Sequence, residues 1–255
     1  MDGALPRINM FWHGPRLGPV HAACIRSFQR HGHAVVMHCY EPPEDLPDGV
    51  EIFDAAQIMP RSDLITNAAT GSVSLGTNRY RYRLLQSGDV GIYSDCDMYC
   101  LRPIPDADYI FGWEDLRIIN GAFLKYPADS DLARALVAGT VSKYPVPEHF
   151  GPRRKRLLRA LRAVGLGVSV EKMRWGVWGP RLLTTTIEEL GLQEKAQPID
   201  RYYPIHYLCV PLLNDPELRI EDIVTPRTHA LHLWHSKKDG ESAPDGSPLH
   251  QILNS

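Results

Sequence analysis

The first 60 residues alternate between short runs of strand-forming residues and one helix-forming stretch, and this alternation limits the possible fold more than any other feature. Residues 7–14 and 34–40 are rich in the residue types that favour strands. Between them, residues 19–33 place apolar side chains at helical spacing and stop at Gly32. Another short strand is expected within 50–59. A strand, a helix and a strand in this order favour a parallel sheet with helices packed on its faces.

The later part of the chain continues this alternation less regularly. A helix is expected over 77–88, and a buried strand follows it at 90–93. Two more strands, at 108–115 and 118–126, are close enough to form a hairpin. The remaining expected segments are a helix over 179–192, a short strand or loop at 229–237, and a loose polar tail over 241–255. With 255 residues, these segments fit a single α/β domain.

Composition and charge exclude several classes of protein. The net charge of −2 gives no general attraction to nucleic acid or to anionic membranes, so any such attraction has to be local. No apolar run approaches the ~20 residues of a membrane span, and the first residues lack the pattern of a signal peptide. The 5 cysteines are scattered without a CxxC pair, which indicates reduced thiols in a cytoplasmic protein and no zinc site.

The segment GIYSDCDMYC, residues 91–100, places Asp95 and Asp97 one residue apart at the end of an apolar run. Ligands of open α/β sheets bind at the carboxyl ends of strands. A carboxylate pair there is consistent with a solvated turn, and also with a divalent-metal site for a diphosphate. A third alternative is a HAD-type phosphohydrolase with Asp95 as its nucleophile. Met98 and the position of the motif in the middle of the chain disfavour that alternative.

Several stretches, taken together, resemble one family of enzymes. They are INMFWHG (8–14), SFQRHGHAVVMHCYEP (27–42), TNRYRYRLL (77–85), GIYSDCDMYCLRP (91–103), INGAFLKYP (119–127), WGPRLLT (178–184) and HALHLWHS (229–236). In the same order, they resemble motifs of the DxD-motif glycosyltransferases with the GT-A fold. This group includes the Och1-like mannosyltransferases, the bacterial capsular polysaccharide glycosyltransferases and, distantly, the clostridial glucosylating toxins.

The resemblance implies both a fold and an activity. The fold is a GT-A-like (Rossmann-like) α/β domain over 1–240, with a mixed, mostly parallel sheet flanked by helices. Its nucleotide-binding half covers about 1–105 and its acceptor half about 106–240. The activity is transfer of a sugar from a nucleotide-sugar donor, a UDP-hexose, to a hydroxyl acceptor with retention of configuration. The acceptor is a glycan or lipid-linked glycan of bacterial polysaccharide or glycolipid synthesis. A non-catalytic protein that binds nucleotide-sugars remains an alternative.

The resemblance also implies a metal site. Asp97 would bind Mn²⁺ or Mg²⁺ directly, and Asp95 would bind the ion through water or hold hydroxyls of the ribose and the sugar. His232 would supply a third ligand from far along the chain. Mixed carboxylate and imidazole ligands suit Mn²⁺, and the cation would stabilise the charge that builds on the leaving diphosphate.

By the same resemblance, further residues would hold the donor. Trp12 would stack on uracil, with Tyr40 beside the base or the ribose. Arg81 would reach oxygens of the sugar and the phosphates through its guanidinium group. Trp234 and Ser236 would donate hydrogen bonds to the β-phosphate.

The sugar and the acceptor would meet a separate group of side chains. Asn78 stands where relatives carry an acidic residue that contacts the donor sugar, so the identity of that sugar stays open. Asn120 would form a hydrogen bond with a sugar hydroxyl. Trp113, Glu114 and Asp115 follow a predicted strand and are candidates for the lining of the acceptor pocket.

A basic segment, RRKRLLRALRAVG, begins at residue 153 and carries 6 positive charges in its first ten residues. It is consistent with a solvated basic helix on the surface. It is also consistent with an amphipathic helix over 153–164 that contacts anionic lipid, or the pyrophosphate of a lipid-linked acceptor, at the inner face of the cell membrane. Nucleic-acid binding is not expected, because the segment has no interleaved aromatic residues and the whole chain is not basic.

Overall fold

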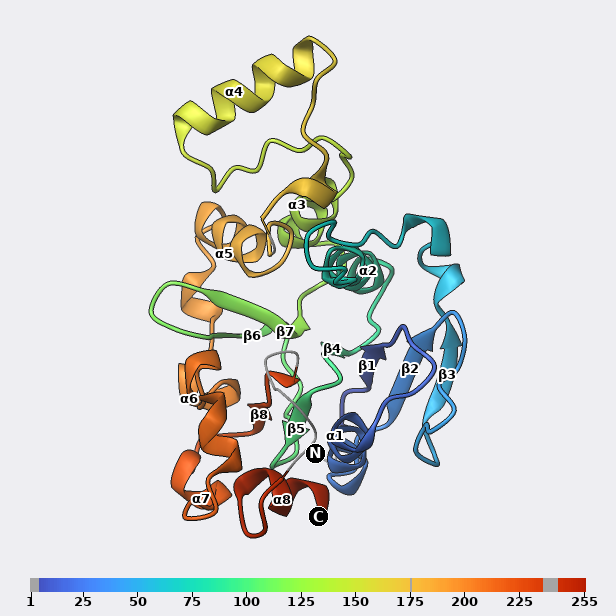
Figure 1. Ribbon diagram of the computed structural model, residues 1–255, viewed down its shortest axis with the longest axis vertical. Helices are drawn as coiled ribbons and strands as arrows, with labels where there is room; N and C mark the ends of the chain where they lie inside the picture. Colours follow the sequence, from blue (N-terminus) through green and yellow to red (C-terminus); the bar gives the residue numbers. More distant parts are fainter. Residues whose placement is uncertain (1–4, 175, 236–242) are drawn as a thin grey trace.

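The computed structural model describes residues 5–174, 176–235 and 243–255, and its centre is a six-stranded sheet in the order β3-β2-β1-β4-β7-β6 (Figure 1). The strands are β1 (Ile8–Phe11), β2 (Val35–Cys39), β3 (Glu51–Asp54), β4 (Ile92–Ser94), β6 (Ile110–Trp113) and β7 (Ile119–Lys125). β1 to β4 are parallel to one another, whereas β7 runs antiparallel to both β4 and β6. The predicted mixed and mostly parallel α/β sheet is therefore confirmed, including its hairpin.

Helices cover both faces of this sheet, because successive strand residues point to opposite faces. In β1, Ile8 and Met10 pack in the same cluster as α1 (Pro19–Arg30). Phe11 packs in the opposite cluster, with side chains of α2, α3 and α5. Those three helices are α2 (Ser74–Gln86), α3 (Asp131–Gly139) and α5 (Pro180–Glu189). Each large apolar side chain buried in this way contributes roughly 1.5–3 kcal/mol, so the two clusters hold the central strands from both sides.

A second, two-stranded sheet pairs β5 (Met98–Cys100) with β8 (Ala230–His232). Beside it, α8 (Pro248–Leu253) packs against α1 and buries Leu249 and Ile252 completely. The side chain of Ser247 begins this helix by accepting a hydrogen bond from the N–H of His250. The prediction of a loose tail over 241–255 is therefore wrong for residues 248–253.

The other helices are short or lie away from the sheet. They are α4 (Pro152–Ala163), α6 (Ile199–Tyr202), α7 (Ile220–Ile223) and 3₁₀ segments at Ala55–Gln57, Arg61–Asp63, Val170–Lys172, Gln193–Lys195 and Tyr207–Asn214. Among the described residues, no helix combines the length and the apolar character needed to cross a bilayer.

A series of hydrogen bonds between buried polar side chains joins β1, β2 and α2. His38 Nε2 lies 2.9 Å from Asn9 Oδ1, and His38 Nδ1 lies 2.8 Å from the hydroxyl oxygen of Tyr80. The amide of Asn9 donates in turn to the carbonyl oxygen of Val90 at 2.8 Å. Burial lowers the pKa of His38 to about 4, so the imidazole is held here as a neutral group.

We expect the free energy of unfolding to fall as the pH is lowered from 6.5 to about 4. In this window the unfolded chain takes up a proton on His38 and the folded chain does not, at a cost of about 1.4 kcal/mol per pH unit. The contribution of His38 is complete above pH 6.5 and is lost on the acid side. Urea unfolding at several pH values should show a shallower dependence in His38→Gln. Replacement of the exposed His13 by glutamine is the control. If the free energy of unfolding depends on pH equally in the wild type and both variants, His38 is not the group responsible.

Candidate active site

The acidic pair lies in the turn between β4 and β5, and the surrounding backbone sets the position of both carboxylates. The chain enters β4 through Gly91, which has a φ of 96° and would place a Cβ against the carbonyl oxygen of Arg7. Asp95 follows β4, and its N–H donates to the carbonyl oxygen of Ala122 in β7 at 2.7 Å. Asp97 comes directly before β5. Both residues therefore stand at the carboxyl end of a parallel strand, where ligands of such sheets bind.

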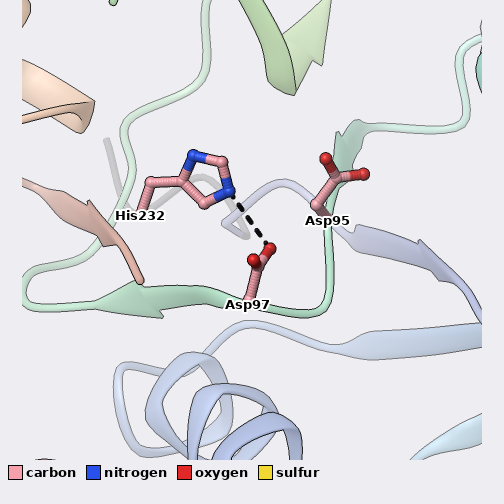
Figure 2. A group of neighbouring side chains, drawn as sticks. All are labelled: Asp95, Asp97 and His232. Carbon is pink, nitrogen blue, oxygen red and sulfur yellow. Dashed lines mark ion pairs between the residues drawn. The ribbon is translucent and has the colours of Figure 1, made fainter. Parts of the chain in front are cut away.

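β8 brings a histidine from far along the chain onto this pair. Met98 lies opposite His232 in the antiparallel pairing of β5 with β8, and the N–H of Leu233 donates to the carbonyl oxygen of Asp97 at 2.9 Å. His232 Nε2 consequently lies 3.2 Å from Asp97 Oδ1. The dashed line in Figure 2 marks this pair. Ligand atoms of Asp95, Asp97 and His232 all lie within 4.8 Å of one another. The structure thus brings together the three residues that the resemblance assigned to a metal site.

The chemistry of this cluster fits a divalent cation. Two carboxylates and one imidazole are a donor set that suits Mn²⁺, and Mg²⁺ also accepts the carboxylate oxygens. The side chains of Asp95, Asp97 and His232 are 28%, 15% and 7% exposed, so the cluster is sheltered but open to solvent on the side of Asp95. Such partial shelter strengthens the attraction between the cluster and a cation.

Histidines surround the carboxylate of Asp97. Oδ1 faces His232, and Oδ2 accepts the backbone N–H of His235 at 3.0 Å, while the ring of His21 lies nearby. Burial by itself would raise the pKa of Asp97, but the charge and the hydrogen bond of His232 outweigh it and hold that pKa below its usual value. Burial likewise opposes the charge on His232, and Asp97 reverses this and raises the pKa of His232. The two directions agree on a carboxylate–imidazolium pair in the metal-free protein, and the imidazolium has to release its proton before Nε2 can bind a cation.

Asp95 is held by α2 and β4. Arg81 Nη2 donates to Asp95 Oδ1 at 2.8 Å, and the hydroxyl of Tyr93 donates to the same oxygen at 3.1 Å. The second terminal nitrogen of Arg81 donates to the carbonyl oxygen of Gly121. Burial raises the pKa of Asp95, and the positive charge of Arg81 offsets this only in part. Arg81 and Tyr93 together therefore fix one oxygen of this carboxylate.

The segment after β8 turns sharply around Asp97. Trp234 has a φ of 52°, a left-handed conformation that costs a bulky residue about 1–2 kcal/mol. Through this turn, the N–H groups of Leu233 and His235 both reach Asp97. The strain lies next to the cluster, as backbone strain at functional sites commonly does.

The Trp234 side chain is engaged within the protein. Its ring centroid lies 3.9 Å from that of His232, and its indole N–H donates to the carbonyl oxygen of Ile205 at 2.8 Å. That N–H is therefore occupied, and the predicted donation from Trp234 to a β-phosphate does not match this arrangement. The indole ring of Trp234 instead packs against the imidazole of His232. Ser236, the other residue predicted for this contact, lies outside the described residues.

Near the turn of the β6–β7 hairpin, Asn120 and Glu114 form one unit. Asn120 Nδ2 donates to Glu114 Oε2 at 2.7 Å, and Asn120 Oδ1 accepts the N–H of Ala122 at 2.7 Å. Burial raises the pKa of Glu114, and the hydrogen bond from Asn120 partly offsets this. Glu114, Asp115 and His206 form a second group with ligand atoms within 4.8 Å of one another. This hairpin therefore presents polar groups at the residues that the sequence analysis proposed for the lining of the acceptor pocket.

An aromatic series leads from the end of β1 to Asp97. The ring centroids of Trp12 and His21 are 4.6 Å apart, and those of His21 and His235 are 4.7 Å apart. The indole N–H of Trp12 is buried and has no hydrogen-bond partner among the described residues. Trp12 is thus placed on the same side of the molecule as the acidic pair, as its predicted contact with a nucleotide base requires.

Tyr40 and Asn78 differ in what surrounds them. Tyr40 lines a cavity of about 370 Å³ with Arg61 and other residues, and its hydroxyl donates to the carbonyl oxygen of Met59 at 2.9 Å. Asn78 is buried in α2, one helical turn before Arg81, and lies against the start of α5. Tyr40 therefore borders open space, whereas Asn78 packs between helices. A larger cavity of about 570 Å³ at the amino ends of the strands is lined by none of the predicted site residues.

Three neighbours of the cluster were not singled out from the sequence: His21, His235 and Tyr93. Tyr93 carried a usable signal, because it lies two residues before Asp95 and strand periodicity puts both side chains on one face. His235 follows the HLW segment directly. His21 carried no signal, since one histidine in an amphipathic helix is common.

No protein-family model and no curated protein sequence matches the chain. One solved structure that it resembles is described as "WbbM bifunctional glycosytransferase apo structure", with a TM-score of 0.41 and 11% sequence identity. The match covers 99% of this chain and 49% of that chain, so the protein spans about half the length of that structure.

Proposed function

We propose that this protein is a metal-dependent glycosyltransferase that moves a sugar from a nucleotide-sugar donor, a UDP-hexose, to a hydroxyl acceptor. The observation that carries the proposal is the cluster of Asp95, Asp97 and His232 at the carboxyl end of a strand in a mostly parallel sheet. The resemblance of the motifs around these residues supports it. In such a reaction a nucleotide diphosphate leaves the anomeric carbon, and negative charge develops on its oxygens.

Within this proposal, Asp97 and His232 hold Mn²⁺ or Mg²⁺, with Asp95 beside them. The chemistry that a bound cation supplies is stabilisation of the charge on the departing diphosphate. Arg81 keeps Asp95 in place through Oδ1 and adds a fixed positive charge close to the cluster. Trp12 stacks on the base at the end of β1, and stacking of this kind is worth ~1–3 kcal/mol.

The acceptor side of the proposed site lies at the β6–β7 hairpin. Glu114 offers a carboxylate and Asn120 an amide, both of which bind hydroxyl groups. We propose a glycan or a lipid-linked glycan as acceptor, in bacterial polysaccharide or glycolipid synthesis in the cytoplasm, on the resemblance of the motifs. Retention of configuration rests on the same resemblance. Proton NMR of the first-formed product would test it, because an α-linked donor should then give an α-linked product.

A phosphohydrolase with Asp95 as nucleophile fits this geometry less well. The nucleophilic aspartate of such an enzyme follows the first strand of its sheet, and threonine or valine comes directly after its second aspartate. Here the acidic pair follows β4, whereas β1 ends in Phe11 and is followed by Trp12. Met98 stands directly after Asp97.

Calorimetric titration with UDP, with and without Mn²⁺, tests the proposal. We expect UDP to bind about tenfold more weakly, or not at all, when the metal is absent. Asp97→Asn should remove the difference between the two conditions. If neither UDP nor GDP binds with metal present, or if Asp97→Asn binds as the wild type does, the proposed site is wrong. Metal-dependent binding of UDP-sugars without any turnover would instead identify a nucleotide-sugar-binding protein.

A further inference from the structure

α4 stands apart from the sheet, at one end of the long axis of the molecule, with α3 and α5 between it and the strands (Figure 1). Leu158 is the one residue of this helix that is buried. It packs in a small cluster with Leu75, Val170 and Trp178. Besides Leu158, Lys155 pairs with Glu148 and Arg154 stacks on the ring of Phe150, so few side chains hold the helix to the body and most of its surface lies outside the core.

The exposed surface of α4 is strongly basic. Its exposed arginines are Arg153, Arg154, Arg156, Arg159 and Arg162. Within the part of the chain that the structure describes, none of them forms an ion pair, whereas Lys155 pairs with Glu148 at 2.8 Å. A net charge of −2 for the whole chain means that this concentration of positive charge is local. It is complementary to an anionic surface.

Apolar side chains are exposed among these arginines. Leu157, Val164 and Leu166 are 58%, 69% and 68% exposed. At about 100° per residue, Arg153 and Leu157 project within about 40° of each other, and Leu157 lies about 100° around the helix from the buried Leu158. Large exposed apolar groups beside guanidinium groups are typical of a helix at the boundary between lipid headgroups and acyl chains.

We propose that α4 is the site at which this protein binds an anionic lipid bilayer. The helix lies in the plane of the interface, with its arginines on lipid phosphates and with Leu157, Val164 and Leu166 among the first carbons of the acyl chains. Single-stranded nucleic acid fits this surface less well, because bases need aromatic platforms and the exposed face carries aliphatic side chains. The proposal does not rest on the glycosyltransferase activity, since it involves no residue of the metal cluster.

Flotation of the full chain with vesicles tests this proposal. Wild type should float with an equal mixture of phosphatidylglycerol and phosphatidylcholine, should not float with phosphatidylcholine alone, and should be released by high salt. The triple variant Arg153→Ser/Arg156→Ser/Arg159→Ser should bind about a hundredfold more weakly, which is about fivefold per arginine. Leu157→Ser keeps the charge and should weaken binding about tenfold by removing buried apolar surface.

A matched control distinguishes the effect of α4 on vesicle binding from the effect of the protein's net charge. Arg16→Ser/Arg26→Ser/Lys195→Ser removes the same charge from other exposed positions and should bind vesicles as the wild type does. Far-UV circular dichroism confirms that each variant is folded. Failure of the wild type to float would overturn the proposal, and so would equal weakening in the control triple. Binding to a single-stranded RNA homopolymer in place of vesicles would also overturn it.

Discussion

Replacement of Asp97 by asparagine should reduce kcat/KM for transfer from a UDP-hexose by about a thousandfold, which corresponds to about 4 kcal/mol of transition-state stabilisation. Asparagine has the shape of aspartate and can still accept the N–H of His235. It carries no negative charge, so both the cation site and the pair with His232 are weakened. Initial rates of UDP release at saturating Mn²⁺ would measure the loss.

Asp89→Asn is the matched control for this experiment. It makes the same chemical change at a carboxylate whose side chain is 86% exposed and lies 3.7 Å from Lys125. Its effect on the rate should be less than about twofold, because exposed ion pairs contribute little. Wild-type activity in Asp97→Asn, with the fold confirmed by circular dichroism, would show that the acidic pair is a solvated turn.

Much of the fold follows from local signals in the sequence. Alternating strand and helix periods, with Gly32 as a stop, predicted the parallel part of the sheet and the β6–β7 hairpin. The helix at 248–253 was missed, because its surroundings are polar and its apolar side is marked by three residues alone, Leu249, Ile252 and Leu253. Contact with α1 orders this segment, and a contact between the two ends of a chain is not visible in local periodicity.

Part of the candidate site could likewise be predicted from local sequence, and part could not. Asp95 and Asp97 are separated by one residue in the sequence, so strand periodicity was enough to place them at the end of β4. His232 could be added only through the resemblance of motifs, because its position depends on the pairing of β5 with β8. The bond from Trp234 to Ile205 also joins distant segments, and for that reason no local pattern showed that the indole N–H is engaged.

Arg81→Met should lower the free energy of unfolding by about 3 kcal/mol, which for a domain of this size is a decrease in Tm of roughly 6–12 °C. Methionine fills a similar volume but leaves the largely buried carboxylate of Asp95 without its ion-pair partner. The carbonyl oxygen of Gly121 also loses a donor. Thermal unfolding followed by circular dichroism would measure the change, with no nucleotide or metal added.

Arg83→Met is the matched control in the same helix. Arg83 pairs with Asp63 at 3.1 Å, but their side chains are 29% and 39% exposed, so the loss should stay below about 1 kcal/mol. The double variant Arg81→Met/Asp95→Asn should be more stable than Arg81→Met alone, because the unpaired charge is then gone. If the double variant is as unstable as the single one, Arg81 stabilises the fold through Gly121 or by packing on Tyr93 and does not act through Asp95. Recovery in the double variant would identify Arg81 as the residue that positions the first carboxylate of the acidic pair.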